Sequence, residues 1–380
     1  MSGLAAPSLS RADMSWTTEW RRTVDWPILF AAVSLMAFGL LMSLAAGPPA
    51  AERLGYDTYH FVMRQSVFVS GAFVVLMGAS ILDRQLARRA AAFVFILALA
   101  LMAVIILFGH EAKGAQRWIR LAGFSLQPSE MAKPALLVLA GWLLAQRHYY
   151  PEGPWTVLAF SIYSTTIGLL LIQPDVGQAV LLTAAFVAAF FVSGLPLRWA
   201  AMFAGGGAAL AGLLYALLPH VRYRVNSFID PSAYDTYQID KAAEAIGRGG
   251  LLGAGPGEGL VKSSLPDAHT DFVFAVLVEE YGFIAATVLL GFFAFITVRG
   301  LWLAARIDDP FARTAASGLF ALFGLQTVIN IGVNVALIPP KGMTLPFVSY
   351  GGSSLIGTAL TLGFALALVR RPALNRRRYG

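Results

Sequence analysis

The chain has 380 residues, of which 57% are hydrophobic and only 13% are charged, and its formal net charge is +7. Soluble domains carry about 25% charged residues, so this composition excludes an ordinary soluble protein and predicts a polytopic membrane protein. The chain has no cysteine, which excludes disulfides and thiol chemistry.

Ten apolar segments are long enough to cross a bilayer as helices. We therefore expect an all-α integral membrane protein with ten transmembrane helices in a membrane domain (26–370). A polar segment (1–25) precedes this domain, and a basic tail (371–380) follows it. The predicted spans cover approximately residues 26–46, 61–82, 90–109, 129–146, 155–173, 176–194, 197–218, 271–298, 313–338 and 351–369.

The distribution of basic residues indicates the orientation of the chain. Most arginines fall on the side that holds both termini, and loops rich in arginine stay in the cytoplasm. We therefore expect cytoplasmic termini and an extracytoplasmic loop (219–270) between helices 7 and 8. The basic excess is a topology signal and not a nucleic-acid footprint. All the lysines fall on the outer side, where insertion does not favour them, and this placement suggests ligand contacts: Lys113, Lys133, Lys241, Lys262 and Lys341.

The long outer loop ends in Lys262-Ser-Ser-Leu-Pro-Asp-Ala-His-Thr-Asp271 and runs into an apolar segment. Thr270 is the expected N-cap, and Asp271 is expected in the first helical turn, where the helix dipole favours a carboxylate. This position places Asp271 at headgroup depth. Glu279 and Glu280 follow roughly 12–14 Å deeper, at the rise of an α-helix. Ionisable groups in a membrane are costly, so all three are functional candidates, although a plain helix cap remains an alternative for Asp271.

Two features of the same loop precede Asp271. Ile239, Ala242, Ala243 and Ile246 follow helical spacing and predict a short amphipathic helix. The glycine-rich stretch that follows (247–259) predicts a flexible lid hinge or, as the alternative, a phosphate-cradling nest. It is not a Walker motif, because no Lys-Ser/Thr pair follows at the required spacing.

Other outer segments carry further candidates. Glu130 and Lys133 are three residues apart on one helix face, which permits an ion pair that is either structural or involved in holding a diphosphate. Arg117 is able to hold a phosphate with two parallel hydrogen bonds. His269 lies two residues before Asp271, either as a group that tunes it or as an ordinary loop residue. Asp175, in a tight turn between two spans, is expected to be structural.

Four of these stretches together resemble the SEDS family (shape, elongation, division and sporulation), over about residues 22–370. The stretches are Gly-Ala-Gln-Arg117-Trp-Ile, Gln127-Pro-Ser-Glu130-Met-Ala-Lys133, Pro266-Asp-Ala-His-Thr-Asp271-Phe with Glu279-Glu280, and Leu345-Pro-Phe-Val-Ser-Tyr-Gly-Gly-Ser-Ser354. Within the family, Pro340-Lys341-Gly342-Met-Thr-Leu-Pro is more similar to the cell-division subfamily than to the elongation subfamily.

The resemblance implies a ten-span inner-membrane peptidoglycan glycosyltransferase. Such enzymes polymerise lipid II, a disaccharide peptide on a polyprenyl diphosphate, into glycan strands outside the membrane during septal wall synthesis. It also implies a class B penicillin-binding protein, a transpeptidase, as partner, and we expect the eighth and ninth spans to form that contact. The resemblance makes Asp271 the catalytic aspartate. Our expected substrate-binding residues are Glu130, Lys133, Arg117, Lys341, His269 and Ser349.

The chemistry of the substrate agrees with one catalytic carboxylate. A diphosphate is already a good leaving group, so a single base that accepts a proton from the attacking sugar hydroxyl is sufficient. A carboxylate pair formed with Glu279 is not expected at a separation of roughly 12 Å. No metal-ligand spacing is visible in the sequence, although diphosphate chemistry commonly uses Mg²⁺ or Mn²⁺.

Two other functions remain open from the sequence. In a lipid II flippase, Glu130, Glu279 and Glu280 would be cavity or proton-relay residues. A non-catalytic scaffold for other wall enzymes is the third possibility. The large outer loop favours the enzyme, because a flippase needs groups that are accessible from both sides, and the inner loops offer none.

Overall fold

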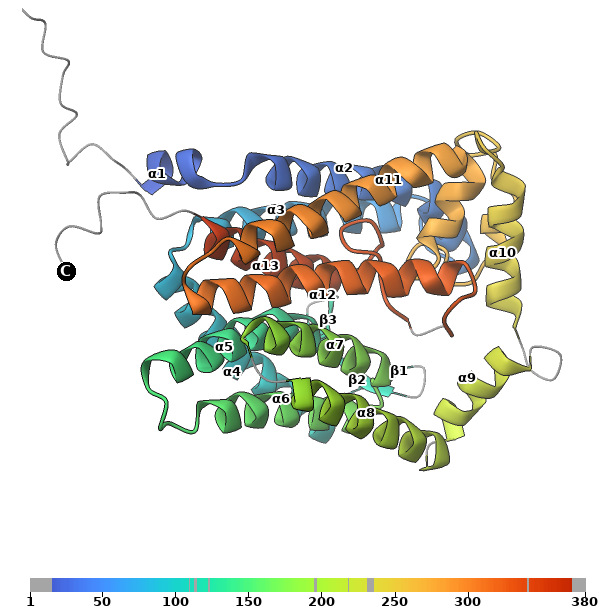
Figure 1. The fold of residues 1–380 in the computed structure, drawn as a ribbon. Coiled ribbons are helices and arrows are strands. Elements are labelled where there is room, and N and C mark those ends of the chain that lie inside the picture. Colours follow the sequence, from blue (N-terminus) through green and yellow to red (C-terminus); the bar gives the residue numbers. More distant parts are fainter. Residues whose placement is uncertain are drawn as a thin grey trace, which may run out of the picture.

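The computed structural model describes residues 16–108, 110–112, 115–121, 124–194, 197–217, 219–230, 236–339 and 342–370. Its long helices run roughly along one axis (Figure 1). Helix α1 (Trp16–Thr23) lies at one end of the bundle, called the α1 end below. Helices α9 (Pro219–Ile229) and α10 (Tyr237–Gly249) lie at the opposite end, called the α10 end.

Each of the ten predicted spans coincides with a helix over most of its length. The main differences are at helix ends: the first of these helices continues through Pro48 and Pro49, and the eighth starts later and ends later than predicted. The helices are α2 (Trp26–Arg53), α3 (His60–Ile81), α4 (Arg84–Phe108), α5 (Ser129–Tyr149), α6 (Trp155–Ile172), α7 (Val176–Val192), α8 (Leu197–Leu217), α11 (Val273–Ala305), α12 (Pro310–Asn334) and α13 (Gly352–Val369).

Many of these helices are long and apolar enough to cross a membrane. In the described part of the chain, seven helices are long and apolar enough to cross a bilayer: α2, α3, α4, α6, α11, α12 and α13. Helix α7 is a shorter apolar helix of 17 residues. The chain is therefore a mainly helical, multi-pass membrane protein.

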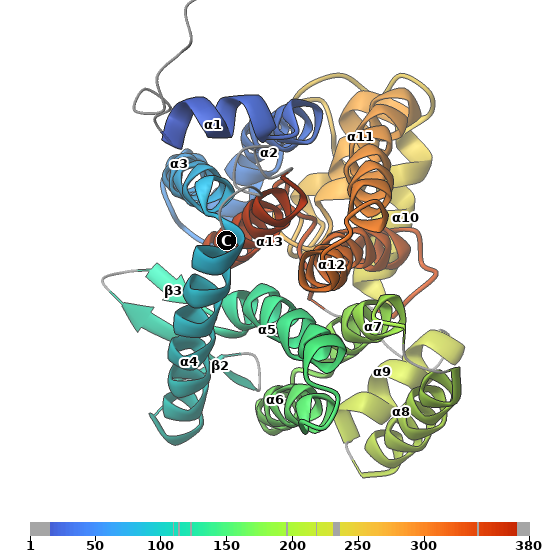
Figure 2. The same cartoon turned by 60° about the vertical axis from the view of Figure 1, so that its left-hand side comes forward.

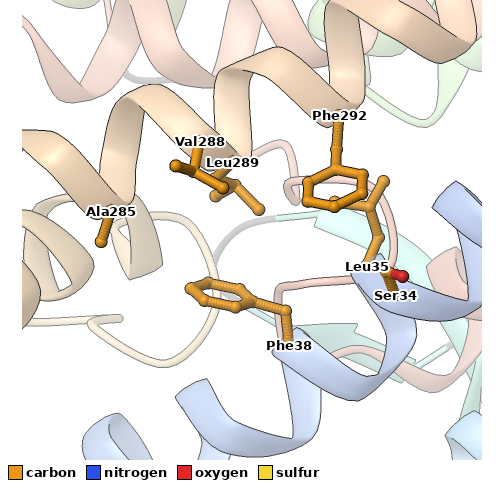
Figure 3. A pocket seen from close by; sticks show the side chains of 7 residues that line it. All are labelled: Ser34, Leu35, Phe38, Ala285, Val288, Leu289 and Phe292. Carbon is orange, nitrogen blue, oxygen red and sulfur yellow. The ribbon is translucent and has the colours of Figure 1, made fainter.

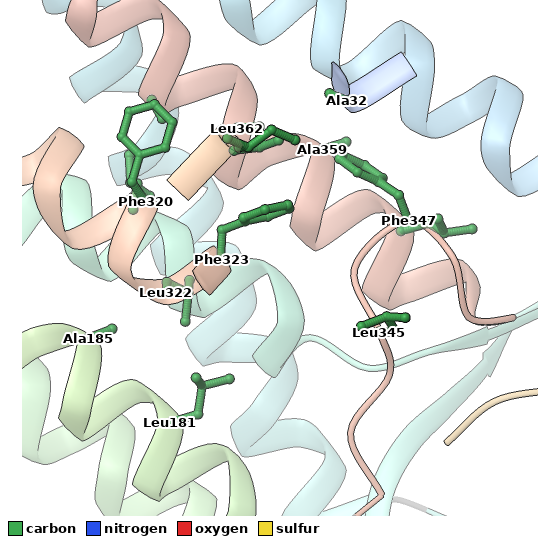
Figure 4. Packing of buried hydrophobic residues seen from close by; sticks show 14 of the residues in the cluster. Ala32, Leu181, Ala185, Phe320, Leu322, Phe323, Leu345, Phe347, Ala359 and Leu362 are labelled. Atoms are coloured by element: carbon green, nitrogen blue, oxygen red, sulfur yellow. The ribbon is translucent and has the colours of Figure 1, made fainter. Parts of the chain in front are cut away.

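Helices α12 and α13 form the interior of the bundle. In the most apolar stretch of α13, 78% of the residues are buried, against 28% for α3 and α4. Helix α12 contacts α5, α7, α11 and α13, as the view along the bundle shows (Figure 2). Phenylalanines of α12 pack beside leucine and alanine side chains of α13, and the loop after α12 adds Phe347 to the same cluster (Figure 4).

Two helices begin with the same arrangement at the α1 end. Asp25 caps α2 by accepting a hydrogen bond from Ile28 N–H at 3.1 Å, and Asp309 caps α12 by accepting one from Phe311 N–H at 3.0 Å. Both helices also carry a proline in their first turn, where its missing N–H costs nothing. Arg299 of α11 and Arg84 of α4 pair with these two carboxylates, so each cap also ties two helices together.

A small antiparallel sheet stands where the sequence predicted only a loop before α5. Its strands β1 (His110–Ala112), β2 (Ala115–Leu121) and β3 (Phe124–Leu126) are paired in that order. His110 lies opposite Trp118, and Ile119 lies opposite Leu126. The sheet positions Arg117, in the middle of β2, over the turn between α6 and α7.

The predicted amphipathic helix is confirmed as α10, with a different buried face. Ala242 and Ala245 are fully buried, whereas Ala243 is exposed. Helix α10 packs on α11 rather than lying free on a membrane surface. It therefore covers this end of the bundle beside the start of α11.

An apolar groove of about 190 Å³ opens between α2 and α11, away from the polar groups of the α10 end. Phe38 of α2 faces Leu289 and Phe292 of α11 across it, and Ser34 contributes the single hydroxyl to its lining (Figure 3). Hydrocarbon fits such a lining, but charged groups do not. The groove is therefore separate from the candidate active site.

Candidate active site

Asp271 lies in a turn just before α11 rather than inside its first turn. Helix α11 begins at Val273 with Phe272 as its N-cap, so the predicted cap at Thr270 is wrong. The reason lies at Asp267, whose backbone has a left-handed φ of 53°. The Asp267 carbonyl accepts hydrogen bonds from the N–H groups of Thr270 and Asp271, both at 3.1 Å, and the resulting turn precedes the helix.

The Asp271 side chain is partly exposed and faces the loop that follows α12. A Cβ built at Gly342 would lie 3.6 Å from Asp271 Oδ2, and Gly342 has a φ of +64° that favours glycine. The loop backbone therefore comes close to the carboxylate without a side chain at that point. Lys341, a predicted substrate contact, lies outside the described residues.

Hydrogen bonds fix the conformation of the loop from 342 to 351, both within the loop and to α3 and α13. Ser349, another predicted substrate contact, is buried, and its hydroxyl accepts a hydrogen bond from Leu345 N–H at 2.8 Å. The Ser349 carbonyl accepts one from Gln65 of α3 at 3.3 Å, and Thr344 bonds Ser354 at the start of α13. These contacts give Ser349 a structural role in shaping the loop opposite Asp271.

His269 joins this loop to the turn that carries Asp271. Its carbonyl accepts a hydrogen bond from Tyr350 N–H at 2.9 Å. Its ring lies 4.5 Å from the ring of Phe61 and 5.5 Å from that of Tyr350, measured between centroids. An aromatic cluster therefore supports the turn two residues before Asp271.

Glu130 and Lys133 form the predicted ion pair, and it is buried. Lys133 Nζ lies 3.0 Å from Glu130 Oε2, and the two residues are only 2% and 4% exposed. Gln178 of α7 completes the cluster: it accepts from Lys133 Nζ and donates to Glu130 Oε1, both at 2.7 Å. Buried charges are stable only when paired and hydrogen-bonded, and this cluster meets that condition.

Arg117 points to the turn between α6 and α7. Its guanidinium donates to the Gln173 carbonyl at 3.0 Å and to the Pro174 carbonyl, and it lies 3.5 Å from Asp175 Oδ1. Asp175 also accepts from Gln127 at 3.1 Å. Burial raises the pKa of the Asp175 carboxyl, and the Arg117 charge opposes that shift. The structural role expected for Asp175 is confirmed, and Arg117 is committed to the same turn.

Glu279 and Glu280 are both 1% exposed and bind the end of the long loop. Glu279 accepts hydrogen bonds from the N–H groups of Val261 at 2.7 Å and Lys262 at 3.0 Å. Glu280 pairs with the Lys262 ammonium group. The two carboxylates therefore fix the segment that leads to Asp271.

Helix α11 is broken at Gly282, whose φ of 76° and ψ of −178° lie outside the helical region. In a continuous helix, the N–H groups of residues 283 and 284 would bond the carbonyls four residues earlier. Here Phe283 N–H donates to the Gly250 carbonyl at 3.0 Å, and Ile284 N–H donates to the Leu251 carbonyl at 3.2 Å. The glycine-rich loop thus supplies the acceptors that the break removes.

The same loop also supplies the missing donors. Ala254 N–H bonds the Glu279 carbonyl at 2.8 Å, and Gly255 N–H bonds the Glu280 carbonyl at 3.0 Å. A Cβ on Gly253 would lie 2.2 Å from the Glu280 carbonyl oxygen, so the approach requires glycine there. We call residues 249–255 the glycine clamp. Both the predicted phosphate nest and the predicted lid hinge are wrong for it, because its backbone is bonded to α11.

The described residues therefore bring the predicted groups together in two places. Asp271, His269 and Ser349 meet around the loop after α12, whereas Glu130, Lys133 and Arg117 belong to a buried polar cluster that runs between β2 and α5. Gln178 and Gln127 were missed, although glutamine next to an apolar span is itself a signal for buried hydrogen bonding. Within the described parts of the chain, no group of three or more His, Asp or Glu side chains is arranged to hold a metal ion.

The two places are linked through the start of α13. Ser353 Oγ accepts a hydrogen bond from Gln127 N–H at 2.8 Å. Ser354, the next residue, bonds Thr344 of the loop that faces Asp271. A partly exposed aspartate, held in a hydrogen-bonded turn and linked through the start of α13 to a buried cluster of paired charges, is equipped to accept a proton from a sugar hydroxyl.

Known proteins share both the sequence and the fold. The family model for cell cycle proteins of the FtsW, RodA and SpoVE type matches residues 26–372. The chain is 48% identical over 374 residues to the "Probable peptidoglycan glycosyltransferase FtsW" of Caulobacter vibrioides, a match that covers 98% of this chain and 95% of that protein. The protein of the same name from Geobacter sulfurreducens is 37% identical over 364 residues, covering 91% and 95%.

Two solved structures extend the comparison to three dimensions. The crystal structure of the Thermus thermophilus rod shape determining protein RodA has a TM-score of 0.67 at 30% identity and covers 91% of this chain and 96% of that one. A chain from a structure described as "Structural coordination of polymerization and crosslinking by a peptidoglycan synthase complex" has a TM-score of 0.74 at 30% identity and covers 91% and 97%. This chain belongs to the FtsW, RodA and SpoVE family of cell cycle proteins.

Proposed function

We propose that this protein is a peptidoglycan glycosyltransferase that polymerises lipid II into glycan strands at the outer face of the inner membrane, in septal wall synthesis. The observation that carries the proposal is Asp271, a partly exposed carboxylate in a rigid turn at the α10 end. The names of the relatives support the same reaction: the proteins from Caulobacter vibrioides and Geobacter sulfurreducens are both described as probable peptidoglycan glycosyltransferases FtsW.

Asp271 acts as the general base in the proposed step. Its carboxylate accepts the proton of the sugar hydroxyl that attacks the anomeric carbon of a second lipid-linked sugar. A new C–O bond forms at that carbon while its bond to the phosphate oxygen breaks. The bonding electron pair leaves with polyprenyl diphosphate, which needs no protonation to depart.

Of the six groups expected to bind substrate, the proposal keeps Lys341 as a direct contact and gives supporting roles to Glu130, Lys133, Arg117, His269 and Ser349. Lys341 enters the proposal on its charge alone, because an ammonium group is suited to a diphosphate oxygen. The buried cluster of Lys133, Glu130 and Gln178 contributes by holding α5 against α7 beside the site. Arg117 and Ser349 act through the turn and the loop that they hold, and His269 acts through the turn before Asp271.

The proposed topology has ten spans with cytoplasmic N- and C-termini. Helices α5, α7 and α8 join the seven apolar helices as spans. Residues 219–270 form the extracytoplasmic loop between α8 and α11, which are the seventh and eighth spans. Residues 1–25 and 371–380 are the cytoplasmic segments. Reporter fusions at residues 240 and 378 are expected to report outside and inside, respectively. The same side for both would contradict the proposal.

The proposed partner is a class B penicillin-binding protein of the transpeptidase type, and its transmembrane segment docks on α11 and α12. Support comes from the related chain found in a structure described as a peptidoglycan synthase complex. Helix α11 also exposes large apolar side chains such as Phe283, Ile284 and Val288 along its length. Co-purification without a transpeptidase that stimulates activity would count against this partner.

Polymerisation of lipid II by the purified chain, reconstituted in vesicles with its transpeptidase, tests the proposed function. We expect glycan strands from the wild-type protein and a large loss with Asp271→Asn. Transfer of lipid II between leaflets without glycan product would establish the flippase instead. Activity only with an elongation-type transpeptidase would move the protein to the RodA-type role.

A further inference from the structure

Two asparagines of α12 converge on the backbone of Asp271. Asn330 and Asn334 are one helical turn apart and are 1% and 0% exposed. Each side-chain amide donates a hydrogen bond to the Asp271 carbonyl, at 3.0 Å from Asn330 and 2.9 Å from Asn334. Two donors from one helix thus meet on a single carbonyl oxygen.

Each asparagine also binds a second segment of the site. Asn330 Nδ2 donates to the Met343 carbonyl at 2.6 Å, in the loop that faces the Asp271 carboxylate. Asn334 Oδ1 accepts from Ala275 N–H at 3.1 Å, in the first turn of α11. The two amides therefore fix the spacing between the turn that carries Asp271, the start of α11 and the facing loop.

The Asp271 carbonyl needs these partners because of where α11 begins. In a helix that included Asp271, its carbonyl would accept from Ala275 N–H. Ala275 N–H instead donates to the Phe272 carbonyl at 3.0 Å and to Asn334. The asparagines supply the partly buried Asp271 carbonyl with the donors that the helix does not provide. They also fix the peptide plane that follows Asp271 and hence the direction of its side chain.

We propose that Asn330 and Asn334 are positioning residues that hold Asp271 at the correct distance from the attacking sugar hydroxyl. This inference rests on the proposed function of Asp271 as general base. A general base works within about 2.6–3.2 Å of the proton donor. A displacement of 1 Å costs about 10²-fold in rate. Neither asparagine touches the substrate in this proposal.

The test uses Asn330→Ser and Asn334→Ser in the full-length protein with its transpeptidase partner. In a helix, a serine hydroxyl bonds the carbonyl three or four residues earlier, so it leaves Asp271 and does not remain unsatisfied itself. We expect kcat for lipid II polymerisation to fall roughly 10- to 100-fold in each variant, with KM unchanged. If a serine variant fails to accumulate, the threonine variant at the same position replaces it, for the same reason.

Combination with Asp271→Asn separates positioning from a general structural role. If the asparagines act through the Asp271 carboxylate, adding Asn330→Ser to Asp271→Asn produces little further loss of rate, because residues that act as a unit are non-additive. Full additivity, or a wild-type rate in both serine variants, overturns the inference. A wild-type rate for Asp271→Asn alone instead contradicts the proposed function.

Ser80→Ala is the matched control for lost stability. It removes a buried side-chain hydrogen bond from Trp20 Nε1 to Ser80 Oγ of 3.1 Å at the α1 end. We expect it to lower the unfolding temperature in detergent as the serine variants do, while kcat stays at the wild-type value. A similar fall in kcat for Ser80→Ala would show that the loss in the asparagine variants is a stability effect, and would overturn the inference.

Discussion

Three carboxylates within ten residues of one another have different surroundings. Glu279 and Glu280 are buried, and loop N–H groups and Lys262 bind their oxygens. At Asp271 it is the backbone that is fixed, while the carboxylate stays partly exposed toward the facing loop. The comparison shows that an acid in a membrane segment is not a functional group by depth alone. What distinguishes Asp271 is that two asparagine amides bind its main-chain carbonyl, while the residue is partly exposed and its Oδ2 faces the loop at Gly342.

The largest expected effect is on chemistry, at Asp271. Asp271→Asn keeps the shape of the side chain but cannot accept a proton, so we expect polymerisation to fall by about 10²–10⁴-fold. The unfolding temperature should stay close to that of the wild type, because the main-chain bonds to Asn330 and Asn334 remain. Lipid II turnover and thermal unfolding of the same preparation measure both quantities. If Asp271→Asn lost its fold as well as its rate, Asp271 would have a structural role like that of the glutamates.

The glutamate side of the comparison should show the reverse pattern. Lys262→Met leaves Glu280 as a buried carboxylate without its cation, and breaking a buried pair costs about 3–5 kcal/mol. The double variant Lys262→Met with Glu280→Met removes both charges and should recover much of that loss. Thermal unfolding of the wild type, both single variants and the double variant measures the coupling. Equal stability of Lys262→Met and the wild type would show that the pair contributes nothing.

Alanine should destabilise the glycine clamp at Gly253 more than it destabilises the adjoining loop at Gly257. Both have a positive φ, +82° and +86°, so alanine at either position costs about 1–3 kcal/mol in backbone strain. A Cβ at Gly253 would also lie 2.2 Å from the Glu280 carbonyl oxygen, whereas a Cβ at Gly257 meets nothing within 4 Å. We expect Gly253→Ala to unfold at a clearly lower temperature than Gly257→Ala. If the two variants unfold at the same temperature, the packing around Gly253 is looser than the hydrogen bonds of the clamp indicate.

The smallest expected effect is pH-dependent and concerns Arg117. Removal of its charge in Arg117→Ala raises the pKa of the buried Asp175 carboxyl further above the ordinary value of 3.8. An acid whose pKa is higher in the folded state loses stability as pH rises from its unfolded pKa through its folded pKa. The deficit relative to the wild type, roughly 1–3 kcal/mol for a lost charged hydrogen bond, should therefore be larger at pH 7 than near pH 4. Unfolding midpoints at both pH values measure it, and a deficit that is constant with pH would mean that Asp175 does not titrate in this range.

The sequence was a good guide to the helices and to one ion pair on a helix face. Each apolar run predicted as a span coincides with a helix in the described part of the chain, because long apolar runs admit few alternatives in a membrane. The Glu130–Lys133 pair followed from spacing alone. The residues that resemble the SEDS motifs also identified the family, which the relatives confirm.

Contacts between distant segments could not be predicted in this way. The hydrogen bonds of the glycine clamp were not predicted because they depend on the break at Gly282, about thirty residues later in the chain. Thr270 and Asp271 were expected to cap and begin α11, but the turn at Asp267 places the start of the helix later, at Val273. The asparagines of α12 and the glutamines around Lys133 have partners on distant segments of the chain, and helical periodicity carries no information about such partners.

The broken turn of α11 also has a consequence for biogenesis. Every group that completes it, from Gly250 to Gly255, comes earlier in the chain than Gly282. The same is true of Val261 and Lys262, which bind the two buried glutamates. Synthesis from the N-terminus therefore delivers the partners before the segment that needs them. Chain order thus allows both acids of α11 to be matched with their partners as soon as this half of the helix is made.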